Sequence, residues 1–365
     1  MAARTAIVVG AGVMGACTAW GLHERGWEVT LVDAGPVPNP HGSSGGVHRL
    51  IRTTYGDMAG YTRMVVEAYE AWQDLWTTIG RELWAHTGMV AVDTAESTFA
   101  ADTRATFDAL GLDYDLLNAG QLHQRYPQFR IADDATALYS DDAHFIRARE
   151  TVGALTSWLH YQGMEVLPGT RVTAVDADAG TATTEDGTVL RADAVVVAAG
   201  PWTPAVAGID PPEVVPSRQV VLDLRVPDRF RRAWADGPAF LVPPAYGIPP
   251  RQELPLKVSD HHFSKQGHPD DDRTPGADEV EAIFEVVGEA ITDLTSYELL
   301  DARVCYYTVR DDERFVVEPR GERAALLAGF SGHGFKMGAI VGRRVAAALT
   351  GERPWDEVTR WAAGH

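Results

Sequence analysis

Three glycines near the N-terminus have the spacing of a phosphate-binding turn. Residues 5–9, TAIVV, form an apolar and β-branched run, and Gly10, Gly12 and Gly15 follow it. After such a strand Gly10 allows a tight turn, Gly12 lets a pyrophosphate approach the backbone, and Gly15 brings the next helix onto the strand. The spacing therefore predicts a dinucleotide-binding turn between a strand and a helix.

The residues after the glycines complete a strand–helix–strand unit. The helix includes Val13 and Met14, is expected to stop at Gly26, and leads into a strand, EVTLVD, that ends in Asp33. Amides at a helix start hold phosphates, and a carboxylate about 20 residues further on accepts hydrogen bonds from ribose hydroxyls. The unit does not distinguish NAD from FAD, because both present an ADP moiety to it.

The acidic composition limits the class of partner. The chain has 365 residues, and 32 Lys and Arg against 51 Asp and Glu give a formal net charge of −19. This balance argues against a nucleic acid as the main partner, since a polyanion would be repelled. Apolar residues make up 45% of the chain, enough for large cores. At roughly 150 residues per domain, the length predicts about two domains.

Two cysteines and short apolar runs bear on the compartment. Cys17 and Cys305 are too few for a disulfide framework or a metal cage, so a reducing compartment and no metal site are expected. The N-terminal residues enter a strand pattern without an export-type apolar stretch. The longest apolar runs, such as AVVVAA at 194–199, are too short to span a bilayer. We therefore expect a soluble, cytoplasmic protein with no membrane segment.

Two textures alternate along the chain. The first, with buried strands and apolar-faced helices, returns as a helix at about 148–163, strands at 171–176 and 194–199 with a hairpin at 185–187 between them, and a strand, glycine turn and helix at 324–351. The strands at 171–199 are expected to extend the first domain's sheet. The second texture is Pro-rich, with alternating strands such as QVVLDLRV at 219–226.

These textures predict a mixed α/β chain. A Rossmann-like dinucleotide-binding domain is assigned residues 1–84, 146–210 and 305–365, and an antiparallel-sheet substrate domain, inserted in two pieces, is assigned residues 85–145 and 211–304.

Four segments together resemble a family of flavin-dependent amine oxidases. They are VVGAGVMG at 8–15, HGSSGGVHRLIRTTYGD at 41–57, VCYYTVRDDERFVVEP at 304–319 and AGFSGHGFKMG at 328–338. The family is that of monomeric sarcosine oxidase and N-methyltryptophan oxidase, within the D-amino acid oxidase superfamily, and the similarity runs the whole chain. The resemblance implies that the dinucleotide is FAD.

A cysteine matching Cys305 carries a covalent bond to the 8α position of FAD in this family. A thiolate favoured by neighbouring cations can act as a nucleophile in that way. Without the resemblance, Cys305 reads as a small buried thiol in a strand, as we assume for Cys17 on the first helix. The resemblance implies a covalent flavin at Cys305.

Arg49 and Arg52 are three residues apart, so they project from one face of a helical turn or from opposite faces of a strand. On their own they could be surface arginines. The resemblance implies that Arg49 lies by the flavin and that Arg52 holds the substrate carboxylate, which a guanidinium binds in a bidentate way. It implies Lys336 as the second carboxylate contact.

Four further residues have implied catalytic or substrate roles. Lys257 matches the lysine that activates oxygen in the family, where a buried positive charge stabilises superoxide as it forms. A lone lysine in a strand is otherwise a surface residue in most cases. His261, Tyr246 and Tyr307 match three other active-site positions.

The cofactor-binding residues expected from the glycine unit and the resemblance are Gly10, Gly12, Val13, Met14, Gly15, Asp33, Ser43, Ser44, Arg49, Arg52, Val172, Gly200, Trp202, Cys305, Gly332, His333, Gly334, Phe335 and Lys336.

Two segments depart from the family pattern. Sarcosine oxidases carry two histidines where this chain reads GSSGGVH at 42–48, and the segment YGIPPRQELPLK before Lys257 is Pro-rich where theirs is Gly- and Phe-rich. The stretch ahead of Tyr246 is also shortened. Both changes border the substrate pocket, so we expect the chemistry to be retained and the substrate to differ.

The expected reaction is oxidation of a secondary, N-methyl amino acid. Hydride passes from the carbon next to nitrogen to the flavin, which gives an imine, and O2 is reduced to hydrogen peroxide. The expected partners are the amino acid and O2, and a monomer is expected.

Three alternatives remain open. The substrate could be a cyclic amino or imino acid, of the pipecolate or piperideine-carboxylate type, in a biosynthetic pathway. The protein could be a nicotinamide-dependent dehydrogenase or a flavoprotein that passes electrons to a carrier, which Cys305 and Lys257 oppose. It could be a non-catalytic ligand-binding relative, which Arg52, Lys336 and Cys305 oppose.

Overall fold

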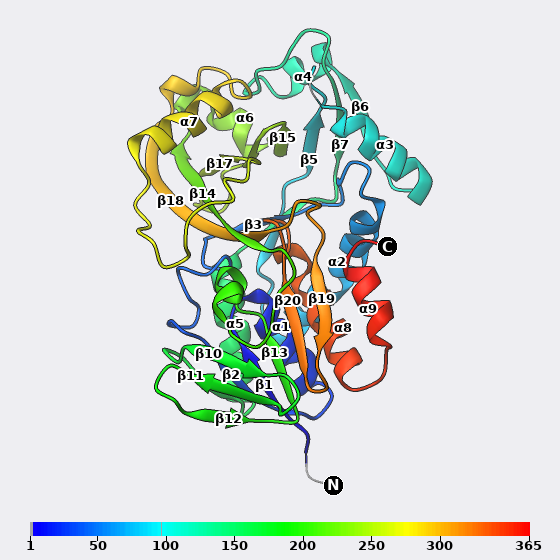
Figure 1. Ribbon diagram of the computed structural model, residues 1–365. Coiled ribbons are helices and arrows are strands. Elements are labelled where there is room, and N and C mark those ends of the chain that lie inside the picture. The colour runs from blue at the N-terminus through cyan, green and yellow to red at the C-terminus, as the bar shows by residue number, and fades with distance from the viewer. Residues whose placement is uncertain (1–2, 96) are drawn as a thin grey trace.

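A six-stranded sheet positions the glycine turn. The computed structural model describes residues 3–95 and 97–365, and this sheet lies in the lower half of Figure 1. Five strands are parallel and β19 is antiparallel at one edge. In spatial order the strands are β19 (Val316–Arg320), β20 (Ala324–Ala328), β13 (Ala194–Val197), β1 (Thr5–Val9), β2 (Glu28–Val32) and β9 (Glu165–Leu167).

Helices from both ends of the chain pack beside this sheet. They are α1 (Val13–His23), α2 (Ala59–Ile79), α5 (Ala148–Tyr161), α8 (Gly338–Leu349) and α9 (Trp355–Ala362). A Cβ added to Gly342 would lie 2.3 Å from the backbone carbon of Cys17, so α8 can approach α1 this closely only with glycine there. The packing buries the Cys17 side chain completely.

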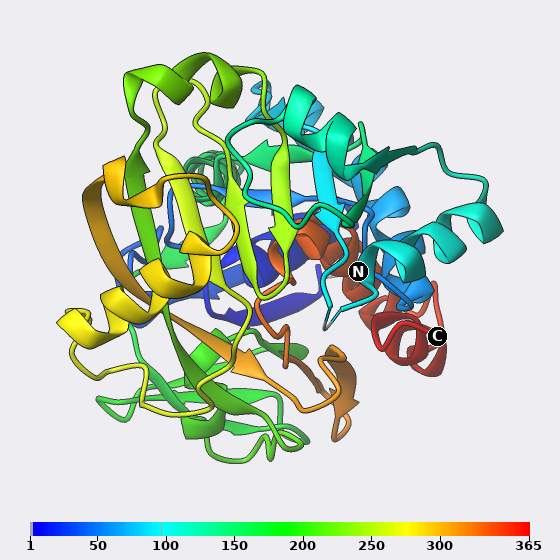
Figure 2. The ribbon, with the colours of Figure 1, turned by 90° about the horizontal axis from the view of Figure 1, so that it is seen from above.

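An eight-stranded sheet occupies the upper half of Figure 1 and is seen from above in Figure 2. Neighbouring strands are antiparallel, except that β15 and β5 are parallel and so join two distant chain segments. In spatial order the strands are β18 (Glu298–Val309), β14 (Val215–Arg225), β17 (Leu256–Asp260), β16 (Ala245–Ile248), β15 (Ala239–Val242), β5 (Met89–Val92), β7 (Thr136–Ser140) and β6 (Asp115–Asn118). The helices of this half are α3 (Phe99–Leu110), α4 (Ala119–Arg125), α6 (Arg231–Ala235) and α7 (Ala277–Gly288).

Two small antiparallel sheets complete the fold. One is β3 (Arg49–Ile51), β8 (His144–Ile146) and β4 (Trp84–His86); the other is β10 (Val172–Asp176), β11 (Thr181–Thr184) and β12 (Val189–Arg191). Four 3₁₀ turns are η1 (Gly200–Ala205), η2 (Asp228–Phe230), η3 (Leu294–Ser296) and η4 (Phe335–Met337).

The prediction that the strands at 171–199 extend the first sheet is wrong for the hairpin. Only β13, a continuously buried strand, enters that sheet beside β1. Among the strands that the structure describes, the hairpin strands pair only with one another, β10 with β11 and β11 with β12. They therefore form a sheet of their own.

The predicted α/β architecture with an antiparallel second sheet is confirmed. Separate buried clusters accompany the two large sheets, one including Trp20 and Val196 and the other including Phe240 and Leu222. The domain boundaries stay a prediction, and β18 runs without a break through the one placed at residue 305. In the described part of the chain, no helix has the length and apolar character needed to cross a membrane.

Candidate functional site

A cavity opens at the carboxyl ends of β1, β2, β13 and β20, where ligands bind in open α/β sheets. Predicted residues that line it are Gly10, Gly12, Val13, Met14, Asp33, Ser43, Ser44, Arg49, Val172, Gly200, Trp202, Tyr307, Gly332, Gly334 and Phe335. The sequence therefore located part of the wall from residues that are spread over the whole chain. Five other residues predicted to bind the cofactor are not among those that line this cavity: Gly15, Arg52, Cys305, His333 and Lys336.

Glycine is needed at positions 10, 12 and 15 for different physical reasons. A Cβ on Gly10, whose φ is 103°, would lie 2.3 Å from the Ala198 carbonyl oxygen, and one on Gly15 would lie 1.8 Å from the Gly10 carbonyl oxygen. The fold itself thus requires both. A Cβ on Gly12 would meet only Ser44 Oγ, at 3.4 Å, which is an ordinary contact. The missing side chain at Gly12 leaves room on the cavity side, as a close pyrophosphate requires.

Asp33 is held rigidly at the cavity wall. Its Oδ2 accepts a hydrogen bond from the backbone amide of Ala11, and its Oδ1 accepts from the Gly35 amide and from Asn39 Nδ2, each at 2.9 Å. Each carboxylate oxygen has two lone pairs, so the group can still accept from a ribose. The start of α1, the open face of Gly12 and this carboxylate together fit the ADP half of FAD.

Arg49 lines the cavity and hydrogen-bonds to the backbone of its own segment. It lies in β3, an extended strand, and its guanidinium donates to the carbonyl oxygens of Ser43 at 2.6 Å and His48 at 2.8 Å. Ser43 Oγ in turn donates to the Tyr306 carbonyl oxygen at 2.6 Å. These bonds attach the 41–49 segment to β18, next to Cys305.

A second, smaller cavity contains Cys305 and meets the first at Gly42 and Arg49, which line both. Lys257 and Arg303 also line it. The Cys305 thiol is therefore partly exposed and lies on the same cavity wall as three cationic side chains, those of Lys257, Arg303 and Arg49. Cys17, by contrast, is fully buried, and burial raises the pKa of its thiol far above the ordinary value.

Lys257 is a buried cation with little to hold it. Its side chain is in β17, 4% exposed, and its Nζ donates to the His48 carbonyl oxygen at 3.3 Å. Burial, followed by the charges of Arg49 and Arg303, lowers the pKa of Lys257 well below its ordinary value. The His48 ring itself is 1% exposed, and neither ring nitrogen has a hydrogen-bond partner among the described residues.

Arg52 and Lys336 meet at one aromatic ring. The Arg52 guanidinium carbon lies 4.9 Å, and Lys336 Nζ 4.8 Å, from the centre of the Tyr55 ring. Lys336 Nζ also donates to the Tyr55 hydroxyl at 3.2 Å, and Arg52 donates to Thr54 Oγ1 at 3.2 Å. Burial, and then the partner arginine, lowers the pKa of Lys336 well below its ordinary value. Neither cation forms an ion pair with a carboxylate of the described residues.

The two arginines follow the extended alternative of the sequence prediction. Arg49, in β3, lines the main cavity. Arg52, just after the strand, instead contacts Tyr55, and its guanidinium carbon lies 5.8 Å from the centre of the Phe99 ring. Their separation follows from the alternation of side chains along a strand.

The other three predicted active-site residues, Tyr307, Tyr246 and His261, have different environments. Tyr307 lines the main cavity, and burial, then Tyr246 and Cys305, raises its pKa well above the ordinary value. Burial also raises the pKa of Tyr246. His261 instead lies at the surface, where its Nε2 is 3.4 Å from Glu313 Oε2.

A sequence model described as FAD dependent oxidoreductase (DAO) matches residues 5–348. The chain belongs to this family of FAD-dependent oxidoreductases. It is 30% identical to the monomeric sarcosine oxidase of Bacillus sp. (strain B-0618), with 96% of this chain and 93% of the relative covered. It is 28% identical to the N-methyl-L-tryptophan oxidase of Citrobacter koseri, with 97% and 96% covered. The resemblance inferred from the four segments is confirmed.

Solved structures show the same fold. NikD, described as an unusual amino acid oxidase essential for nikkomycin biosynthesis, superposes with a TM-score of 0.82 at 20% identity over 100% of this chain and 98% of its own. L-proline dehydrogenase from P. horikoshii gives 0.83 at 20% identity over 98% and 97%. These likenesses confirm the predicted FAD-dependent oxidoreductase fold.

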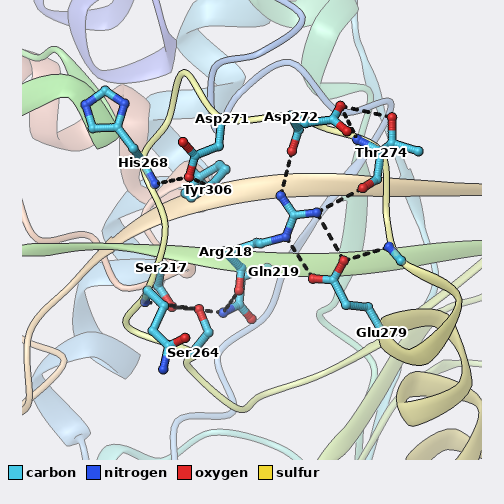
Figure 3. A network of polar contacts seen from close by, with 12 residues as sticks. Ser217, Arg218, Gln219, Ser264, His268, Asp271, Asp272, Thr274, Glu279 and Tyr306 are labelled. Atoms are coloured by element: carbon cyan, nitrogen blue, oxygen red, sulfur yellow. Dashed lines mark hydrogen bonds and ion pairs between the residues drawn. The ribbon is translucent and has the colours of Figure 1, made fainter.

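A loop at residues 261–276 is fixed by polar contacts to Arg218 of β14 (Figure 3). The guanidinium donates to both carboxylate oxygens of Glu279, at 2.7 and 3.1 Å, and to the carbonyl oxygens of Asp272 and Thr274. Such a fork with four acceptors holds the loop in one place.

This loop reaches residues on the cavity wall. Asp270 accepts a 2.7 Å hydrogen bond from Trp202 Nε1 and pairs with Arg171 at 3.4 Å, and both partners line the cavity. Arg273 lies 4.6 Å from the centre of the Tyr306 ring, next to Cys305 in the chain. The loop therefore contacts the outer wall of the main cavity through the charged side chain of Asp270.

Sequence reasoning missed Tyr55 and His48 as site residues. Both lie in the segment 41–57 that carries the resemblance, and Tyr55 follows Arg52 by three residues. That spacing was the available signal for Tyr55. The sequence offered no signal for His48, because its burial among four cations is visible only in the fold.

Proposed function

We propose that the chain is an FAD-dependent oxidase of secondary amino acids, which oxidises the C–N bond and releases hydrogen peroxide. The observation that carries this proposal is the pair Arg52 and Lys336, two cations on one tyrosine ring without a carboxylate partner. In an FAD-dependent oxidoreductase such a pair suits the carboxylate of an amino acid.

The residues of the chain orient the substrate and place charge. Bound FAD supplies the hydride acceptor and the two-electron reaction with O2. Arg52 and Lys336 hold the carboxylate, so that the amine and its neighbouring carbon lie in a fixed position. No general base is required if the amine binds unprotonated. The positive charges of Arg52 and Lys336 favour this form, because they disfavour a protonated amine beside them.

Lys257 is proposed to promote the reaction of the reduced flavin with O2. It lies in the smaller cavity with Cys305 and Arg49, away from Tyr55 and Lys336 in its contacts. A positive charge placed there stabilises superoxide as it forms, which favours the first electron transfer to O2.

Cys305 is proposed to bind FAD covalently at the 8α carbon. The linkage replaces the thiol hydrogen and one methyl hydrogen, and O2 accepts these two hydrogens as hydrogen peroxide. The partly exposed thiol, with Lys257, Arg303 and Arg49 on the wall of the same cavity, supports this assignment over buried Cys17.

The substrate side chain is proposed to be apolar. Phe99 and Tyr246 pack against a buried cluster of Met89, Ala143 and Leu241, and Phe99 also faces Arg52. An N-methyl amino acid and a cyclic amino or imino acid of the pipecolate type both fit such a wall. The second candidate is favoured by Phe99, since a saturated ring would extend toward this apolar surface.

We further propose that the enzyme acts as a cytoplasmic monomer. A reducing compartment keeps the Cys305 thiol free for the flavin. Light scattering of the purified protein tests the monomer.

The test of the covalent bond is acid precipitation followed by a visible spectrum of pellet and supernatant. Yellow colour should stay with the wild-type and Cys17→Ser pellets and move to the supernatant for Cys305→Ser. Free FAD in the wild-type supernatant would contradict the covalent assignment and leave the oxidase assignment in place.

The test of the activity is peroxide release from a panel of amines. Sarcosine, N-methyl-L-tryptophan and pipecolate are each compared with the matching amine that lacks the carboxylate. We expect turnover of at least one amino acid and a loss of about tenfold or more in kcat/KM without the carboxylate. Equal turnover of both members of each pair would contradict the carboxylate clamp.

A further inference from the structure

A chain of hydrogen bonds connects Lys336 to the backbone of a distant loop. Lys336 Nζ lies 3.2 Å from the Tyr55 hydroxyl, this hydroxyl lies 3.1 Å from His333 Nδ1, and His333 Nε2 lies 3.1 Å from the Glu313 carbonyl oxygen. The three contacts join segments that are far apart in the sequence. They extend behind the carboxylate-binding cation.

The chemistry of the last partner fixes the direction of the whole chain. A backbone carbonyl only accepts, so the hydrogen of a neutral His333 is on Nε2 and its Nδ1 is an acceptor. Tyr55 must then donate to Nδ1, and its oxygen is free to accept from Lys336. Reversing any one bond would leave two acceptors or two donors facing each other.

The surroundings keep the His333 ring neutral and still. The ring is 9% exposed, and burial, followed by the charge of Lys336, lowers its pKa well below the ordinary value. Tyr61 and Phe315 lie against it, with ring centroids 5.1 and 4.6 Å away. A fixed neutral imidazole holds the Tyr55 hydroxyl in one rotation.

We propose that His333 and Tyr55 are positioning residues that aim Lys336 at the substrate carboxylate. The proposal rests on the proposed function of Arg52 and Lys336 as the carboxylate clamp. One proton of the Lys336 ammonium is committed to Tyr55, so the other two point in defined directions. Without the acceptor, the flexible lysine side chain has several rotamers, and the carboxylate must order it on binding.

Two substitutions of His333 separate the two ring nitrogens. The amide of asparagine lies about where Nδ1 lies, and its oxygen can accept from Tyr55. The amide of glutamine lies about where Nε2 lies, and it can donate to Glu313 but leaves Tyr55 without its acceptor. We expect His333→Gln and Tyr55→Phe to raise KM for the amino acid about tenfold. We expect His333→Asn to stay within about threefold of wild type, with kcat similar in all variants.

The double variant Tyr55→Phe/His333→Gln provides a second readout. Because both residues act through the same bond to Lys336, its KM should match that of Tyr55→Phe alone. For the matching amine without a carboxylate, kcat/KM should fall less than for the amino acid in Tyr55→Phe, His333→Gln and the double variant. A purely structural role of His333 would instead impair the asparagine and glutamine variants alike, for both kinds of amine.

Acetate binding separates failure of this proposal from failure of the proposed function. The Kd for acetate, followed through the visible spectrum of the flavin-loaded protein, requires no turnover. A weaker Kd in His333→Gln and Tyr55→Phe, with His333→Asn near wild type, supports the positioning role even if no amino acid on the panel is oxidised. An unchanged Kd and KM in Tyr55→Phe, which keeps the ring and its packing, would overturn the proposal.

Discussion

Lys257 and Lys336 are both buried lysines next to an arginine and a histidine, yet their surroundings differ. Lys336, at 5% exposure, donates to Tyr55, which in turn contacts His333. Lys257, at 4% exposure, has one long side-chain hydrogen bond, to the His48 carbonyl oxygen.

The difference matches two requirements: Lys336 needs a defined orientation, whereas Lys257 needs only to place a charge. A carboxylate is bound through directed hydrogen bonds, so the polar chain behind Lys336 gives it an orientation. Stabilisation of a small anion such as superoxide depends mainly on charge and distance, and an unpaired cation at a low-dielectric site supplies both. We therefore expect substitutions at the two lysines to affect different half-reactions.

The largest effect is expected for Lys257→Met. Loss of the charge should slow the reaction of the reduced enzyme with O2 by about 100- to 1,000-fold, the range seen when one preorganised electrostatic contact is removed. Anaerobic reduction by the amino acid should change by less than about threefold. Stopped-flow absorbance of the two half-reactions measures both, and equal losses in both would remove the distinction between the lysines.

The next effect is expected for Lys336→Met and Arg52→Met. Each removes a charge-assisted hydrogen bond to the carboxylate, so KM for the amino acid should rise by about 10- to 100-fold. Steady-state kinetics at several oxygen concentrations measures this, with Lys257→Met as the matched control that keeps its kcat/KM for the amino acid. A clamp variant that loses oxygen reactivity and keeps KM would reverse the assignments.

The affinity for acetate should depend on pH through Lys336. Burial and Arg52 lower the pKa of this lysine well below its ordinary value, and acetate requires the charged form. Binding is therefore full below the lowered pKa and weakens as the pH rises through it, by up to about tenfold per pH unit. Titrations of wild type and Lys336→Arg from pH 6 upward test this, because arginine keeps its charge. Parallel curves would show that Lys336 is not the titrating group.

The smallest effect is expected on stability and concerns His48. Burial, then Lys257, Arg49, Arg303 and Arg147, lowers the pKa of this histidine well below 6.5 in the folded state. The unfolded chain therefore binds more protons below pH 6.5, so this group destabilises the fold as the pH falls. The wild-type free energy of unfolding should drop by up to about 1.4 kcal/mol per pH unit more than that of His48→Leu.

Urea unfolding between pH 5 and 6.5 measures this difference in slope. His48→Leu should flatten the pH dependence while the acetate Kd at Lys336 stays unchanged. Identical slopes in both proteins would mean that His48 is charged in the folded state, in spite of the cations around it.

The fold and part of the cavity wall were accessible from the sequence because they rest on local patterns. The strand at 5–9, the glycines and Asp33 are contiguous in the chain, and the structure places β1, the turn and β2 accordingly. The hairpin at 171–191 was misassigned because the choice of sheet depends on what covers each face, which the strand pattern alone does not contain.

The sequence by itself determined the residue types: the glycine turn, two arginines three apart, and Lys336 and Cys305 in segments typical of one oxidoreductase family. Only the tertiary structure decided which of them meet. Tyr55 and Lys336 are 281 residues apart in the chain and share a hydrogen bond, and Lys257 reaches the backbone of His48 across 209 residues. Such contacts are set by how the sheets and helices pack, and packing depends on all buried side chains together. For this reason the oriented Lys336 and the weakly held Lys257 can be distinguished in the structure and not in the sequence.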